Sequence, residues 1–369
     1  MTDLLSLPLP ELARWVVQDL GEPKYRAKQL YTWLHKKQVT TLEEMTDLPL
    51  ALRQKLAETA FIPPVRTRLR LESKLDGTRK FLLEMADGNC VEAVWMEYHH
   101  GPSLCVSTQV GCRMGCRFCA STLGGLVRDL TAGEMLGEVY EVQRQTGRPV
   151  SSLVLMGIGE PLDNLQNVLD FLTILCSPEG QGLGYRHISL STCGLVPGIR
   201  ALMEKKLGVT LSVSLHAPDD AARDAIMPVN RKYPIGELME ACRDYFAATG
   251  RRISYEYALI DGVNDSPAQA AALARLLRGQ TCHVNLIPVN PVAERDTRRS
   301  TRAAVERFAR RLGELGVNAT IRRELGSDIA AACGQLRRRA AAVEPCTARR
   351  AAAVGPCTAA DAALPGAGR

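Results

Sequence analysis

From residue 104 to about residue 325 the chain alternates between short apolar stretches and amphipathic stretches. This alternation limits the fold more than any other feature, because it predicts parallel strands that are joined by helices. Six strand–helix repeats are too few for a closed eight-fold barrel and suit an open, partial one. We therefore expect an α/β fold built on a partial (β/α)6 barrel.

The individual elements follow from apolar runs and from helix-start signals. Capping boxes at 131–134 and 266–269 each predict the first turn of a helix. The expected strands are 104–110, 152–156, 187–191, 209–215, 253–260, 282–288 and 318–322. The expected helices are 131–146, 165–176, 196–206, 235–249, 267–278 and 301–315.

Three cysteines, Cys112, Cys116 and Cys119, lie on one short loop after the first expected strand. A structural zinc ion usually has four protein ligands, and no fourth Cys or His is nearby. A [4Fe-4S] cluster tolerates three cysteines, which leaves one iron free to bind the amino and carboxylate groups of S-adenosylmethionine (SAM). The C-x3-C-x2-C spacing, with Phe118 before the last cysteine, therefore matches the radical SAM superfamily.

The length of the chain argues against a disulfide framework. With 369 residues it can bury a large core, so its 12 cysteines are better explained by metal binding or catalysis in a reducing compartment. The sequence opens with no basic-then-apolar signal peptide, and no apolar run approaches the roughly 20 residues of a membrane span. We expect a cytoplasmic protein that makes no membrane contact.

Two smaller regions precede the barrel. Residues 1–75 are expected to form a helical, helix-hairpin-helix-like domain that could contact RNA, although Trp33 could equally be core and the nearby lysines only solvated. Residues 76–103 alternate as a β-hairpin extension around an Asp-Gly turn. Glu92 lies on the second strand of this hairpin, where a glutamate is usually a solvent-facing charge.

The net charge of +6 is concentrated near the C-terminus. Residues 293–323 hold nine Arg against four acidic residues, which fits either a phosphate-binding stripe or a solvated helix face. The barrel with its C-terminal loop is expected to span 104–336. Residues 337–369 form a low-complexity tail with an internal repeat of period eleven, and we expect this tail to be disordered.

Small and polar residues stand where several expected strands end, and chemistry in parallel βα folds collects at these carboxyl ends. One strand ends in Met156-Gly-Ile-Gly-Glu160, where Glu160 could accept from an ammonium group. The polar ends at 189–194, 212–216 and 287–291 complete a predicted SAM pocket.

The remaining cysteines differ in their surroundings. Cys242, Cys176 and Cys282 lie on apolar elements and are expected to be core, and burial is the default for Cys105. Cys333 lies in a glycine-flanked loop after the last strand, where a functional role and a structural role are equally plausible.

Several longer strings carry a family resemblance. They are CVSTQVGCRMGCRFC at 105–119, MGIGEP at 156–161, SLHAP at 214–218, HVNLIPVN at 283–290 and DIAAACGQL at 328–336. Over nearly all of residues 10–340 the chain resembles the RlmN/Cfr family of radical SAM RNA methyltransferases, and within it the RlmN type.

This resemblance implies three groups of site residues. Cys112, Cys116 and Cys119 would bind the [4Fe-4S] cluster. The residues that would contact SAM are Gly159, Glu160, Ser191, Ser214, Leu215, His216 and Asn290. Cys333 would carry a methyl group, Cys105 would be its resolving partner, and Glu92 would be a proton acceptor.

The resemblance also implies the reaction. The product would be 2-methyladenosine in 23S rRNA and certain tRNAs, made with two SAM molecules per turnover. The first would methylate the Cys333 thiolate, and the second would give a 5′-deoxyadenosyl radical that activates this methyl group. Release of the RNA would leave a Cys105–Cys333 disulfide that must be reduced again.

The implied partners are 23S rRNA, tRNA and a low-potential electron donor such as flavodoxin or ferredoxin, with a monomer as the default state. Two alternatives stay open. A Cfr-like enzyme would methylate carbon 8 of the same base with the same fold and the same extra cysteines. A non-catalytic iron–sulfur protein that binds RNA or senses redox state would not cleave SAM.

Overall fold

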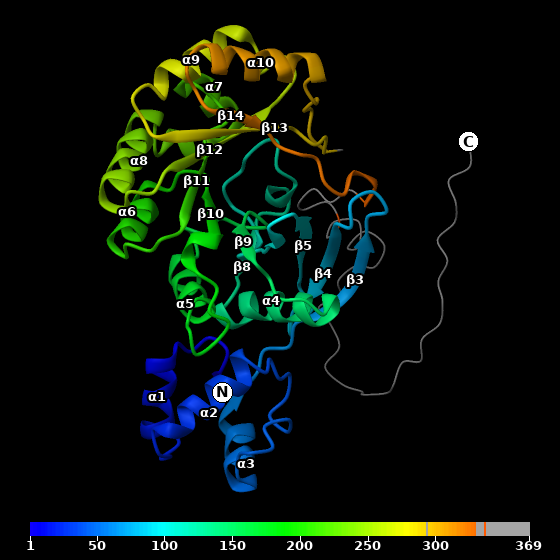
Figure 1. Ribbon diagram of the computed structural model, residues 1–369, viewed down its shortest axis with the longest axis vertical. Helices are drawn as coiled ribbons and strands as arrows, with labels where there is room; N and C mark the ends of the chain where they lie inside the picture. The colour runs from blue at the N-terminus through cyan, green and yellow to red at the C-terminus, as the bar shows by residue number, and fades with distance from the viewer. Residues whose placement is uncertain (293, 330–335, 337–369) are drawn as a thin grey trace, which may run out of the picture.

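A computed structural model describes residues 1–292, 294–329 and 336. Within these residues seven parallel strands form one curved sheet (Figure 1). They are, in spatial order, β6 (Gly101–Cys105), β9 (Ser152–Leu155), β10 (Ile188–Thr192), β11 (Thr210–Ser214), β12 (Ile253–Leu259), β13 (Cys282–Pro288) and β14 (Ala319–Ile321). Each pairs in parallel with its neighbours, which confirms the expected partial barrel.

Helices join these strands and pack on the outer side of the sheet (Figure 1). They are α4 (Ala132–Thr146), α5 (Leu165–Leu175), α6 (Val196–Glu204), α8 (Ile235–Thr249), α9 (Pro267–Leu276) and α10 (Arg302–Glu314). Both predicted capping boxes form, at Thr131 before α4 and at Ser266 before α9. The helix α7 (Asp220–Ile226) was not expected, because seven residues are too few to show a helical period.

Alternation along the strands separates the core from the inner face. Leu190 on β10 and Leu211 on β11 are paired and fully buried in the apolar core. The intervening serines, among them Ser191 and Ser214, point to the opposite side of the sheet. The parallel strands therefore present apolar side chains to the helices and polar ones to the inside.

Three antiparallel strands extend the same sheet beyond β6. They are β3 (Arg66–Glu72), β4 (Arg79–Glu84) and β5 (Cys90–Tyr98). The β4–β5 pair confirms the predicted hairpin. The strand β3 falls inside the region expected to be helical, and it forms because its backbone pairs with β4 although most of its side chains are exposed.

The first expected strand, 104–110, is shorter in the structure. The sheet strand ends at Cys105, and Gln109–Gly111 forms β7, which pairs with β8 (Leu126–Asp129) in a separate two-stranded sheet. The chain turns away because Thr108 and Gln109 both donate their amides to the carbonyl of Ile158. This turn moves the cysteine loop off the sheet.

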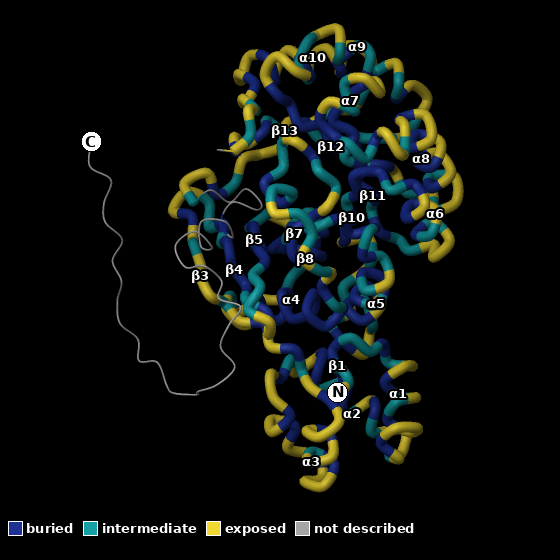
Figure 2. The backbone as a smooth tube through the Cα atoms, turned by 180° about the vertical axis from the view of Figure 1, so that it is seen from behind, coloured by how far each residue is buried: buried dark blue, intermediate teal, exposed yellow. Residues whose placement is uncertain are grey.

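The N-terminal residues form a helical unit below the barrel (Figure 1). It comprises β1 (Thr2–Asp3), α1 (Leu9–Gln18), α2 (Tyr25–His35), α3 (Leu50–Thr59) and β2 (Ala60–Phe61). Its buried leucines are continuous with the core of the barrel, and Figure 2 shows buried backbone on both sides of the junction. Trp33 packs partly against this core while its Nε1 donates to Asp47 at 2.5 Å.

Two further expectations concern membrane contact and the C-terminal tail. No helix among the described residues is long and apolar enough to cross a bilayer. The repeat tail, 337–369, lies outside the described residues.

Candidate active site

The three cysteines of the loop line one cavity at the carboxyl ends of the parallel strands. This cavity of about 270 Å³ is enclosed by Cys112, Cys116 and Cys119 on one side. The predicted SAM residues on its walls are Gly159, Glu160, Ser191, Ser214, His216 and Asn290. Leu215 is fully buried and does not line the cavity. The structure therefore brings together nine of the ten residues expected to bind cluster and SAM.

Backbone hydrogen bonds fix the cysteine loop. The Cys112 amide donates to the Gly125 carbonyl at 2.9 Å, and the Arg117 amide donates to the Ile226 carbonyl at the end of α7, also at 2.9 Å. Burial raises the pKa of the Cys112 thiol to about 12 and raises that of Cys116 as well. A bound iron would offset this cost, because metal ligation deprotonates a thiol.

The three thiols do not form a mononuclear metal centre. Among the described residues, no three Cys, His, Asp or Glu side chains converge tightly enough to hold one ion. A four-iron cluster takes each cysteine on a different iron and so needs thiols that are spread around it. The three thiols line one cavity, as the cysteine ligands of such a cluster would.

The glycines after β9 make close approaches within the protein. A Cβ on Gly157 would lie 2.5 Å from the Val106 carbonyl oxygen. A Cβ on Gly159, whose φ is +113°, would lie 2.7 Å from the Gln109 amide. Both glycines are therefore required where the strand end crosses the 106–109 segment, in addition to lining the cavity.

Glu160 is buried and accepts backbone hydrogen bonds. Its Oε2 accepts from the Cys193 amide at 2.7 Å and its Oε1 from the Leu162 amide at 3.1 Å. Burial raises the pKa of this carboxyl, and the two amides oppose the rise. Glu160 ties the ends of β9 and β10 together while it faces the cavity.

His216 follows β11 in a left-handed conformation, with φ of 59°. A non-glycine residue there is strained, and here the side chain holds the conformation because Nδ1 accepts from the Ala258 amide at 2.9 Å. Burial lowers the pKa of His216 to about 3, so the ring is neutral. Phe118 of the cysteine loop packs edge-on against it, with ring centroids 4.8 Å apart.

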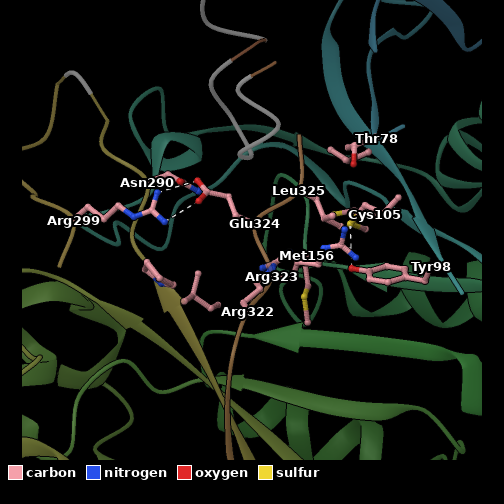
Figure 3. Close-up of a pocket in the computed structure, with 14 residues that line it drawn as sticks. Thr78, Tyr98, Cys105, Met156, Asn290, Arg299, Arg322, Arg323, Glu324 and Leu325 are labelled. Carbon is pink, nitrogen blue, oxygen red and sulfur yellow. Dashed lines mark hydrogen bonds and ion pairs between the residues drawn. The ribbon is translucent and has the colours of Figure 1, made fainter. Parts of the chain in front are cut away.

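A second cavity adjoins the first and contains Cys105. The two share Met156, Ile287, Asn290 and Arg322 as lining residues. Figure 3 shows Cys105 and Tyr98 on one side of this second cavity, with Arg299 and its ion-pair partner Glu324 across from them. Burial raises the pKa of Cys105 to about 11, and the guanidinium of Arg322 opposes that rise.

Glu92 is not the solvent-facing charge that its strand position suggested. It is 2% exposed, and its Oε2 lies 3.0 Å from Nζ of the equally buried Lys80. Sequence reasoning missed this because the hairpin is not a free ribbon: Val94 on the same strand pairs with Cys105 on β6. Glu92 shares a face of β5 with Val94, which lines the second cavity, but does not itself line it.

Cys333 lies outside the described residues. The chain that leads to it is held against the β3–β4 turn, where Ser73 Oγ donates to Asp328 at 2.6 Å and the Lys74 amide donates to the same carboxylate at 2.9 Å. The nine cysteines in the described part of the chain are all free thiols. The expected disulfide therefore has no support there and remains a prediction.

Sequence reasoning also missed two charged cavity residues. Arg322 lines both cavities and Glu256 lines the first, whereas Cys193, at the predicted strand end 189–194, lines the first cavity as expected. Arg322 follows β14, the sheet strand farthest from β6 in the parallel set, so only the folded sheet shows its proximity. Of the three cysteines expected in the core, Cys242 is fully buried, whereas Cys176 and Cys282 are half-buried and pack against the edge of the core.

Comparisons with known proteins agree with this geometry. Residues 2–62 match the family model described as the ribosomal RNA large subunit methyltransferase N-terminal domain, and residues 106–274 match that of the radical SAM superfamily. The chain is similar to the crystal structure of a radical SAM methyltransferase from Sphaerobacter thermophilus, with 44% sequence identity and a TM-score of 0.86. That match covers 91% of this chain and 99% of the other.

Curated relatives extend over almost the same range. The probable dual-specificity RNA methyltransferase RlmN of Lachnoclostridium phytofermentans is 53% identical, covering 91% of this chain and 94% of the relative. Its counterpart in Lachnospira eligens is 51% identical, covering 92% and 97%. The partial barrel and its three-cysteine cavity thus define a radical SAM enzyme, a class that uses a [4Fe-4S] cluster and SAM. More narrowly, the chain belongs to the RlmN family of RNA methyltransferases.

Proposed function

We propose that this enzyme methylates carbon 2 of adenosine in 23S rRNA and in certain tRNAs, through a methyl group carried on Cys333. The observation that carries the proposal is the pair of adjoining cavities. The first cavity is lined by the three thiols and by the residues predicted to contact SAM. The second is lined by Cys105, an extra thiol that cluster binding does not need. The curated relatives are named dual-specificity RNA methyltransferases, which supports more than one kind of RNA substrate.

The target atom explains why a thiol carrier is needed. Carbon 2 of adenine is electron-poor and offers no lone pair to an electrophilic methyl group, so ordinary displacement on SAM should fail there. The cluster and SAM, when bound, supply the one-electron chemistry that activates a methyl group already attached to the protein. Two SAM molecules would be used per turnover, one as the methyl source and one for activation.

The cavity residues then have distinct tasks. Cys112, Cys116 and Cys119 would hold the cluster. Glu160 and His216, fixed by backbone amides, would present an acceptor and a neutral ring to SAM. Gly159, Ser191, Ser214 and Asn290 complete its wall. Leu215, whose amide donates to the Glu256 carbonyl and whose carbonyl accepts from Arg223, would hold the strand end beside His216.

Two cysteines would perform the covalent steps. The Cys333 thiolate would accept a methyl group from the first SAM. That methyl group would give a hydrogen atom to the 5′-deoxyadenosyl group supplied by the second SAM, and its carbon would bond to carbon 2 of the base. The adduct would then lose the carbon 2 proton to Glu92 and one electron to the oxidised cluster. The Cys105 thiolate then attacks the Cys333 sulfur. A sulfur–sulfur bond forms, the sulfur–carbon bond breaks, and the released carbon takes the electron pair and a proton to become the methyl group. An external dithiol reductant must reopen the disulfide.

Glu92 is our proposed acceptor for the proton that leaves carbon 2. The base must leave its stack to enter the cavity, and Glu92 lies on the strand that borders this cavity, paired with Lys80. We also propose how the whole chain is organised. It would consist of an N-terminal helical domain (1–75), a hairpin extension (76–103), the barrel with its C-terminal loop (104–336) and a tail (337–369). The protein would be a cytoplasmic monomer that takes electrons from a flavodoxin or a ferredoxin.

Replacement of Cys105 tests the proposal. Cys105→Ala should still consume SAM and still load Cys333, but it should stop with RNA covalently bound to the protein. Denaturing gels with labelled rRNA fragments would detect this adduct, with Cys176→Ala as a matched thiol control that turns over normally. Normal turnover by Cys105→Ala without an adduct would contradict the resolving role.

A further inference from the structure

A buried arginine on α7 has no role in the chemistry described so far. Arg223 is fully buried, and its guanidinium makes four hydrogen bonds. It donates to the carbonyls of Leu215 at 3.0 Å, Cys193 at 2.6 Å and Ser214 at 3.0 Å, and to Oδ1 of Asn230 at 3.0 Å. All four acceptors are neutral, and the nearby carboxylates of Asp220 and Asp224 bond to the Asn230 amide, so the guanidinium has no direct ion pair.

This charge lies beside the cysteine loop. Three of its acceptors belong to the carboxyl ends of β10 and β11, where the first cavity is lined. Ile226, three residues after Arg223 on α7, accepts the amide of Arg117 in the cysteine loop. Ile226 also packs in one apolar cluster with Cys116 and Cys193. Two independent contacts therefore hold the guanidinium near the thiols.

The guanidinium stands directly behind the wall of the first cavity. The Cys193 carbonyl accepts from it at 2.6 Å, and Cys193 lines that cavity together with the three thiols. A guanidinium keeps its proton at any physiological pH, so the charge is permanent. In a buried site such a charge interacts more strongly than it would in water.

We propose that Arg223 sets the reduction potential of the cluster by holding a fixed positive charge beside it. The inference rests on the proposed cluster at Cys112, Cys116 and Cys119. Reduction adds one electron to a centre that already carries three thiolates, and a nearby cation favours the reduced form. Arg223 would thereby bring the cluster within reach of a low-potential donor. A side chain that only linked these backbone carbonyls through hydrogen bonds would not need to carry a charge.

Redox titration followed by electron paramagnetic resonance tests this on the full-length, reconstituted protein. Arg223→Lys keeps the charge, and Arg223→Gln removes it. At the wild-type midpoint potential, we expect the ratio of reduced to oxidised cluster to fall about tenfold in Arg223→Gln, or about 59 mV for one electron. Arg223→Lys should stay within about twofold of wild type. Iron content and melting temperature report cluster loading and folding.

A second variant covers the case in which Arg223→Gln loses the cluster. The Asn230 amide donates to the carboxylates of both Asp220, at 2.9 Å, and Asp224, at 2.8 Å, so a background of Asp220→Asn with Asp224→Asn surrounds it with amides. Adding Asn230→Asp to that background places a carboxylate against the guanidinium and keeps every hydrogen bond that Arg223 donates. The potential should become more negative than that of the background.

The outcomes separate the inference from the cluster assignment. An unchanged potential in Arg223→Gln, no shift when Asn230→Asp is added to its background, or an equal shift in Arg223→Lys and Arg223→Gln would overturn the electrostatic role. Wild-type protein that binds no iron after reconstitution would instead overturn the cluster assignment, and this inference with it.

Discussion

Lys80 and Glu92 form an ion pair that water does not reach, with side chains 0% and 1% exposed. Removing one partner of such a pair leaves an uncompensated buried charge, whereas replacing both by apolar groups is often tolerated. The pair therefore allows the stability of the site to be separated from its chemistry.

We predict that Lys80→Met lowers the free energy of unfolding by about 3–5 kcal/mol. The double variant Lys80→Met, Glu92→Met should regain most of that loss but should not regain turnover, because Glu92 would be the proton acceptor. Chemical denaturation and methylation assays on the same preparations give both quantities. Methylation by the double variant would show that Glu92 is not the proton acceptor.

Cys105 gives a pH prediction. Burial raises its pKa to about 11, so at neutral pH only a small fraction is thiolate, the form that attacks sulfur. As pH rises toward 11 the thiolate fraction rises, and resolution of the covalent RNA adduct should accelerate about tenfold per pH unit between pH 7 and 9. Single-turnover decay of the adduct measures this rate. A rate that does not change with pH would show that another step limits release.

At the scale of elements, the capping boxes were predictable because each is a local pattern in four residues. Thr131 does more than cap: its hydroxyl accepts from the Glu134 amide at 3.1 Å and also donates to Asp3 of the N-terminal unit at 3.1 Å. Ser266 caps α9 with the same box, and its hydroxyl bonds only to Gln269 among the described residues.

These two caps make a matched pair of substitutions. Ser266→Ala should cost about 1 kcal/mol of stability, the usual value for a lost cap. Thr131→Ala should cost more, because it also removes the bond to Asp3. Thermal unfolding of the two variants compares them directly. Equal losses would mean that the bond between α4 and the N-terminal unit contributes nothing.

Other elements could not be read from local patterns. The strand expected at 104–110 breaks because Thr108 and Gln109 donate to a distant carbonyl, that of Ile158. The strand β3 depends on pairing with β4. The burial of Glu92 follows from the joining of the hairpin to β6, a contact between elements. In each case a tertiary contact decided the outcome, and the expectation drawn from the local sequence was wrong.

At the scale of the whole molecule, the barrel and most of its site were predictable because strand ends in a parallel sheet meet at one edge. Cys105 and Arg322 come from β6 and from the residue after β14, and only the curvature of the sheet brings them to one cavity. No local sequence pattern indicates that two residues so far apart along the chain line the same cavity.

The repeat tail provides a whole-molecule prediction. Curated relatives match about nine-tenths of the chain, and the first of them covers 91%. A chain that ends after Leu336 should keep the melting temperature and the methylation rate of the full chain to within about twofold. A matched truncation after Gly326, which removes Asp328 and Cys333, should abolish turnover. A large loss of rate in the longer truncated chain would assign the tail a role in RNA binding.

The central claim is that this enzyme places a methyl group on carbon 2 of adenosine. The most direct measurement is nucleoside analysis by mass spectrometry of rRNA fragments treated with the purified, reconstituted protein, SAM and a reductant. We predict 2-methyladenosine as the product, with none from Cys333→Ala although its cluster is intact. Formation of 8-methyladenosine instead would contradict the claim and identify a Cfr-like specificity.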